Sequence, residues 1–228
     1  MSASARVQDA YRVGLAVVRV MGDSTKTHEI HRVEEITGRP RYRTLLREMA
    51  DTPEGRRLLA ERPELSSDHI DYDELRRLPA TTLGGAYARH LDDNGLSADY
   101  QAAATRHVDD PAMAYLMRRF RQTHDVWHAL LGIGTTGHEE VLIHWFSYGQ
   151  LQLPVSALIM VFGTLKHLLL ERRWTALQRS TLEAYRAGRD ATPLLPVYWE
   201  DLWEEPIARV RDRYWIRPLD RSRFSAAA

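Results

Sequence analysis

Two histidines and two carboxylates of this chain stand at spacings that suit a metal ion. His124, Asp125 and His128 form an H-D-x-x-H run, and Glu140 follows after eleven intervening residues. On a helix the two histidines lie about 40° apart, and Asp125 lies about 60° beyond His128. The side chains of His124, Asp125 and His128 therefore share roughly one quadrant of a helix. Imidazole nitrogens and carboxylate oxygens together suit Zn²⁺ or Fe²⁺ and, less well, Mn²⁺ or Mg²⁺.

The helix face that carries the two histidines is otherwise apolar. Large side chains recur at helical spacing around it, namely Met113, Leu116, Phe120, Trp127 and Leu131. Unpaired polar groups buried there would cost several kcal/mol, and a bound cation is the simplest compensation. Arg118, Arg119 and Gln122 fall on the opposite face, so an amphipathic helix over 111–131 is expected. The alternative is a pair of core histidines that are satisfied by ordinary hydrogen bonds.

A turn and a second helix follow the histidines. Gly132 should end the first helix, and the pattern Thr136-x-x-Glu139 predicts a capping box that starts a helix over 138–152. Glu139 would then cap this helix, and Glu140 would point back to the first one. His144 lies one turn beyond Glu140. It could be a fifth ligand or support the ligands, although a core histidine bonded to a backbone carbonyl is the simpler interpretation.

Two other metal-dependent classes fit the motif less well. An HD phosphohydrolase needs a further histidine upstream and an aspartate downstream. His90, His107 and Asp201 are available, but Glu140 has no role in that class. A di-iron helical bundle needs a second Glu-x-x-His pair, which the sequence does not contain.

Composition narrows the class of protein further. The 228 residues suffice for one sizeable core. The 31 basic and 31 acidic residues balance, which argues against nucleic acid as a partner. The absence of cysteine excludes disulfides and thiolate zinc sites. Lys166 interrupts the longest apolar run, residues 154–170, so no membrane-spanning helix is expected.

The rest of the sequence is helical in pattern, without alternating strands, repeats or a linker. It predicts one all-α domain over 1–228, a bundle of about eight helices. Further helices are expected at residues 6–21, 42–49, 53–62, 82–92, 154–171, 174–187 and 198–214. The segment between residues 21 and 42, which contains Gly38 and Pro40, has only a weak helical pattern.

The motif HDxxH-x11-E, with the segments TPEGRRLLAERPEL, LPATTLGGAYARHLDDNGLS and PLLPVYWEDLWEEPIARVR, resembles the coenzyme Q biosynthesis protein 4 family over about residues 40–211. The resemblance implies an all-helical homodimer that binds an isoprenoid or quinone-type lipid near a metal. It implies a divalent metal, usually zinc, held by His124, Asp125, His128 and Glu140, which would also be the catalytic residues. Residues 132–138 and His144, usually a lysine there, depart from the family pattern.

The resemblance also implies a function in quinone biosynthesis. The expected reaction is the oxygen-dependent replacement of the ring carboxylate of a prenylated hydroxybenzoate by hydroxyl. The alternative is a non-catalytic scaffold that presents prenylated intermediates to other enzymes of quinone biosynthesis. Either function predicts a cytoplasmic protein with peripheral contact to the inner face of the cell membrane.

Overall fold

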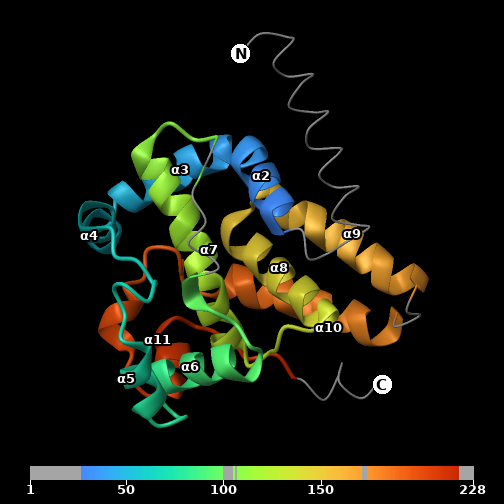
Figure 1. Ribbon diagram of the computed structural model, residues 1–228. Helices are drawn as coiled ribbons and strands as arrows, with labels where there is room; N and C mark the ends of the chain where they lie inside the picture. The colour runs from blue at the N-terminus through green and yellow to red at the C-terminus, as the bar shows by residue number, and fades with distance from the viewer. Residues whose placement is uncertain (1–26, 100–104, 106, 171–173, 221–228) are drawn as a thin grey trace.

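The computed structural model describes residues 27–99, 105, 107–170 and 174–220 (Figure 1). Within these ranges the fold consists of α-helices and one short 3₁₀ helix, with an isolated bridge between Thr82 and Pro206 in place of a sheet. The all-α prediction is confirmed. The helix expected at 6–21 lies outside the described residues. None of the described helices is long and apolar enough to span a bilayer.

Most of the described elements are helices of nine or more residues. In chain order they are α2 (Thr27–Thr37), α3 (Arg39–Ala50), α4 (Pro53–Glu61), α5 (Tyr72–Arg77), α6 (Leu83–Asp93), α7 (Pro111–Leu131), α8 (Gly137–Leu151), α9 (Pro154–Leu170), α10 (Trp174–Asp190), the 3₁₀ helix η2 (Trp199–Leu202) and α11 (Ile207–Arg213).

Helix α7 is the central element of the fold. In Figure 1 it runs through the middle of the molecule, with α8, α9 and α10 on one side and α4, α5, α6 and α11 on the other. Nearly every residue from Met113 to Leu131 is buried. The helix expected over 111–131 is confirmed, but its expected polar, solvent-exposed face is wrong. Arg119 and Gln122 are buried rather than solvated, because neighbouring helices cover that face as well.

The buried arginines of α7 are neutralised by glutamates from distant segments. Arg119 donates to both carboxylate oxygens of Glu200, at 2.6 and 2.9 Å. Arg121 donates to Glu34 at 2.8 Å and to Glu35 at 3.0 Å. Burial of a charged side chain is tolerated only with such partners.

Local signals set the ends of the two motif helices as expected. The Asp110 carboxylate accepts from the backbone N–H groups of Ala112 and Met113, which caps α7. Gly132 ends α7 with φ of +70°, a left-handed conformation that glycine adopts at little cost. At the start of α8, the Glu139 carboxylate accepts from the backbone N–H of Thr136 at 3.2 Å and from its hydroxyl at 2.6 Å.

Three predictions of where helices occur or end were wrong, and in each case contacts between distant segments explain the difference. The weak segment contains α2, whose Glu34 and Glu35 are buried against Arg121. Helix α10 continues through Gly188 to Asp190. A side chain at Gly188 would lie 2.1 Å from the Phe146 carbonyl oxygen, so this glycine permits close packing on α8 rather than ending a helix. The helix expected at 198–214 is split into η2 and α11.

The split at 198–214 follows from backbone pairing with the start of α6. The N–H groups of Leu83 and Gly84 donate to the carbonyls of Glu205 and Trp203, at 2.9 and 2.8 Å, and Ile207 N–H donates to Thr81 at 2.8 Å. These carbonyls and Ile207 N–H cannot also serve a continuous helix. Pro206 lies between them and favours the break.

Candidate metal centre

Three of the four predicted ligands meet between α7 and α8. The Nε2 atoms of His124 and His128 lie 3.1 Å apart. Glu140 places one oxygen 3.5 Å from His124 Nε2 and the other 3.6 Å from His128 Nε2. Ligand atoms at 2.0–2.1 Å around a tetrahedral ion are separated by about 3.3–3.4 Å. The neighbouring ligand atoms of this trio therefore lie at about the spacing that a divalent cation requires, and the group could hold a metal ion.

Helix geometry and the capped turn together produce this arrangement. The two histidines are four residues apart on α7 and thus lie on one face. The Glu139 carboxylate is held by Thr136 and by the backbone N–H of Gly134, at 2.8 Å. It is consequently engaged in the turn, and the adjacent Glu140 is the carboxylate that faces α7, as predicted.

The charges of the trio are unbalanced as the side chains stand. Burial lowers the pKa of His128 well below its usual value, and the neighbouring His124 and His90 add to this effect. Burial also opposes protonation of His124, but the Glu140 carboxylate outweighs it and raises the pKa of His124. The two Nε2 atoms, 3.1 Å apart, and the Glu140 carboxylate all present lone pairs to the same small space. A divalent cation there would accept a lone pair from each of the three side chains.

Asp125, the fourth predicted ligand, is not part of the trio. It is 4% exposed, and burial raises the pKa of its carboxyl to about 6, with Glu140 adding to the rise and His124 opposing it. Its field also contributes to the raised pKa of Tyr87. Asp125 thus lies close enough to influence the trio electrostatically, and its negative charge would favour a bound cation.

Two further histidines border the trio. The His90 ring stacks on His128 with centroids 5.1 Å apart, and the His144 ring lies 5.6 Å from that of His124. Burial lowers the pKa of His90 to about 4 and that of His144 to about 3. Among the described residues, neither His90 Nε2 nor His144 Nδ1 has a hydrogen-bond partner.

The histidine neighbours change two sequence interpretations. The backbone-carbonyl bond expected for His144 is not found among the described residues. The sequence places His90 only in a phosphohydrolase ligand set, because no local signal links α6 to α7, whereas the structure stacks its ring on His128. The Asp201 side chain, the aspartate needed for that class, pairs at the exposed surface with Arg57 at 2.5 Å. The phosphohydrolase ligand set therefore does not assemble.

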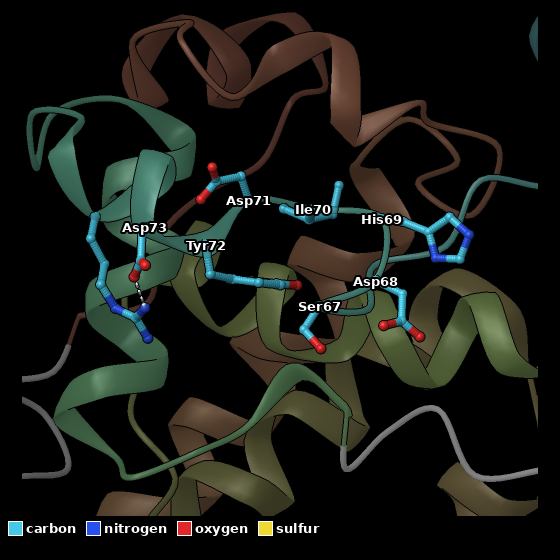
Figure 2. Close-up of a pocket in the computed structure, with 8 residues that line it drawn as sticks. Ser67, Asp68, His69, Ile70, Asp71, Tyr72 and Asp73 are labelled. Carbon is cyan, nitrogen blue, oxygen red and sulfur yellow. Dashed lines mark hydrogen bonds and ion pairs between the residues drawn. The ribbon is translucent and has the colours of Figure 1, made fainter.

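A surface pocket of about 540 Å³ lies elsewhere, along the loop from Ser67 to Asp73 (Figure 2). Its polar side chains largely serve the fold. Asp71 caps α5 by accepting from Glu74 N–H, Asp73 pairs with Arg76 at 2.8 Å, and Ser67 donates to Asp99. No residue of the trio lines this pocket, so its size does not mark it as the site of chemistry.

Comparison with known proteins gives one consistent result. Residues 5–220 match the family described as coenzyme Q (ubiquinone) biosynthesis protein Coq4. The mitochondrial ubiquinone biosynthesis protein COQ4 homolog of Bos taurus is 39% identical over 184 residues, which cover 80% of this chain and 68% of that protein. The Mus musculus homolog is 36% identical over 206 residues, covering 89% of this chain and 71% of the relative.

A solved structure has the same fold. It is a crystal structure from Nostoc punctiforme PCC 73102 of a protein provisionally assigned to ubiquinone biosynthesis. The TM-score is 0.71, and the match covers 90% of this chain and 97% of the other. The sequences are 23% identical, so this likeness supports the fold alone.

Proposed function

Because the chain belongs to the coenzyme Q (ubiquinone) biosynthesis protein Coq4 family, we propose that it catalyses a metal-dependent oxidative decarboxylation in ubiquinone biosynthesis. The substrate is a prenylated hydroxybenzoate-type acid, and the product carries hydroxyl in place of the ring carboxylate. The observation that carries this proposal is the convergence of His124 and His128, with Nε2 atoms 3.1 Å apart, on the two carboxylate oxygens of Glu140, at 3.5 and 3.6 Å.

The net reaction defines what the site must accomplish. One ring–carboxylate C–C bond breaks and one ring C–O bond forms. One aromatic acid, one dioxygen, two electrons and two protons give one phenol, one CO₂ and one water. Dioxygen is the oxidant, and the two electrons come from an external reductant.

Two histidines and one carboxylate on one side of an ion leave other coordination positions open, as in the non-haem iron oxygenases. A divalent ion held by the trio would supply Lewis acidity to the carboxylate and phenolate oxygens of the ring. Zn²⁺ and Fe²⁺ both suit these ligands, and the requirement for dioxygen favours a redox-active ion such as Fe²⁺.

The residues of the chain contribute orientation and charge. His124 and His128 are fixed by the turn spacing of α7, and Glu140 is fixed by the capped start of α8. The Asp125 carboxyl would ionise fully next to a cation, because a nearby positive charge lowers its pKa. It then adds a second negative charge beside the ion without joining the trio.

An exposed apolar surface on α9 supports a prenylated substrate. Val161 and Leu165 are 60% and 40% exposed, and they flank Gly163, which packs against Val141, the residue after Glu140. The isoprenoid chain of the substrate would lie along this apolar surface of α9, the helix that packs against α8 through Gly163 and Val141. Apolar burial, rather than polar contacts, would hold such a chain. A homodimer and peripheral contact with the membrane remain predictions of the sequence.

The test is turnover of the purified protein, loaded with Fe²⁺ and supplied with dioxygen and a reductant. A prenylated 4-hydroxybenzoate labelled with ¹³C in its carboxyl group should release labelled CO₂ and give the hydroquinone. His128→Ala should abolish turnover, whereas His69→Gln, which removes an exposed histidine of the loop in Figure 2, should not.

Asp125→Asn separates an enzyme from a scaffold. This change keeps the shape of the side chain and removes its charge, so an enzyme should lose turnover while its melting temperature stays within a few degrees. Absence of turnover in the wild type, combined with full complementation of a ubiquinone-deficient host by folded Asp125→Asn, would contradict the catalytic proposal and leave the scaffold function.

A further inference from the structure

His144 stands beside the trio without a role in the proposed reaction. It follows Glu140 by four residues on α8, just as His128 follows His124 on α7. His128 approaches Glu140, and His124 approaches His144. The two helices are therefore antiparallel here, and each presents two ligand-type side chains, one turn apart, to the other.

Ring spacing places His144 within reach of an ion held by the trio. Two imidazoles bound to one ion at about 2.1 Å have ring centroids about 4.5–5.5 Å apart. The centroids of His124 and His128 are 4.8 Å apart, and those of His124 and His144 are 5.6 Å apart. His144 lies outside the group whose ligand atoms are all within 4.8 Å of one another, so its side chain would have to rotate toward the ion to bind it.

The hydrogen bonding of His144 points in the same direction. Its Nδ1 atom is buried and has no partner among the residues that the structure describes. A buried polar atom without a partner costs about 1–3 kcal/mol. This cost would disappear if Nδ1 bound a metal ion. It would also disappear if Nε2 bound the ion and Nδ1 donated to a water molecule.

We infer that His144 is a fourth protein ligand, so that the site consists of three imidazoles and one carboxylate. The inference rests on the proposed metal site and adds a specificity to it. Imidazole nitrogens suit Fe²⁺, Co²⁺ and Zn²⁺, whereas Mg²⁺ prefers oxygen. A fourth ligand that is nitrogen therefore selects against Mg²⁺. The positions that remain on the ion would be available to the carboxylate and phenolate oxygens of the substrate.

His90 provides a matched control, because it is also a histidine next to the trio. Its ring stacks on His128 with only 19° between the planes. Stacked rings direct their in-plane nitrogen lone pairs along nearly parallel planes, so His90 and His128 cannot converge on one ion. His90→Phe preserves the stacked ring and removes the nitrogens.

The experiment counts histidine ligands in the Co²⁺-loaded protein by proton NMR. Each ligand imidazole with a protonated second nitrogen gives one strongly shifted exchangeable N–H signal. We expect three such signals for the wild type and for His90→Phe, and two for His144→Phe. Co²⁺ affinity should fall at least about tenfold in His144→Phe, and Mg²⁺ affinity should change less than about twofold. His144→Gln is the second variant if the phenylalanine variant does not fold.

The outcomes separate this inference from the proposed function. Two signals in the wild type, with Co²⁺ affinity unchanged in both His144 variants, would overturn the role of His144 and leave the trio as the site. Failure of the wild type to bind Co²⁺ would overturn the metal site itself. Loss of one signal in His90→Phe instead would assign the additional nitrogen to His90 and contradict the inference.

Discussion

Helix α7 carries two buried clusters of charge that are balanced in different ways. Arg121 is 3% exposed and pairs with Glu34 and Glu35, which are 2% and 3% exposed. Tyr42 also donates to Glu34, at 2.5 Å. Three residues along the same helix, His124 begins the trio with His128 and Glu140. There the carboxylate faces two imidazoles, and no arginine or lysine among the described residues pairs with it.

The two clusters differ in the source of the positive charge that balances their carboxylates. In the first cluster the chain supplies its own cation, and the cluster is closed by hydrogen bonds. In the second the ligand atoms converge at metal-ligand spacing, while buried nitrogens of His90 and His144 have no hydrogen-bond partner among the described residues. One cluster stabilises the fold, and the other has the composition of a binding site.

The largest expected effect comes from breaking the closed cluster. Arg121→Met leaves Glu34 and Glu35 buried without their cation, which should lower the free energy of unfolding by about 3–5 kcal/mol. Urea unfolding measures it. Arg118→Met is the control on the same helix. Its partner Glu64 is 28% exposed and its own side chain 27%, so the loss should stay below about 1 kcal/mol. Equal losses would show that the closed cluster is not special.

The next effect is stabilisation of the open cluster by metal. Fe²⁺ or Zn²⁺ at about 100 times its dissociation constant should raise the free energy of unfolding by about 2.7 kcal/mol. His128→Ala should lose this gain completely, whereas Arg118→Met should keep it. A gain of the same size in His128→Ala would place the bound ion outside the trio.

Two buried groups, His90 beside the trio and Glu34 of the closed cluster, should affect the pH dependence of stability with opposite signs. The pKa of His90 is lowered from 6.5 to about 4 in the folded protein. Between these values the unfolded chain binds the additional proton, so the metal-free protein loses stability as pH falls, by at most about 1.4 kcal/mol per pH unit. His90→Phe should flatten this part of the profile of unfolding free energy against pH.

Glu34 represents the closed cluster in the same measurement. Burial raises its pKa above 4.5, and the Arg121 charge only partly offsets the rise. The folded protein therefore retains a proton that the unfolded chain releases, and stability falls as pH rises from 4.5 through the folded pKa. Glu34→Gln should remove this loss. Profiles parallel to the wild type for both variants would contradict the assigned directions.

The smallest effect concerns the caps that position the open cluster. Thr136→Ala removes a hydroxyl that holds Glu139 at the start of α8, and should cost about 1 kcal/mol. Asp110→Ala removes the cap of α7, about 20 Å along the helix from His124, and should cost about the same. Only Thr136→Ala should weaken metal binding, measured by titration calorimetry. Equal affinities in both variants would show that the turn does not position Glu140.

Much of the site could be predicted because its signals are local. Asp110 and Gly132 bound α7, Thr136 and Glu139 start α8, and the spacing of His124 and His128 places both on one face. These features depend on hydrogen bonds within a few residues, and the structure contains them as expected. Single-residue preferences suffice for such features.

The errors share a non-local cause. Arg119 finds Glu200, and Arg121 finds Glu34, across more than eighty residues of sequence, so their burial could not be read from α7 alone. The helix expected at 174–187 ends too early, because the close contact of Gly188 with Phe146 of α8 has no local signature. The contact of His90 from α6 with the trio also has no local signal in the sequence. Tertiary packing decided each case against the local pattern.

The backbone pairing of residues 81–84 with residues 203–207 has a consequence for the order of folding. About 120 residues separate its two sides, so forming it early would close a very large loop at an entropic cost that nothing yet offsets. Helices α7 to α10 lie within this loop and can form their contacts at much shorter range. We therefore expect the metal ligands to be assembled before the chain closes on itself, and closure to be a late, rate-limiting step.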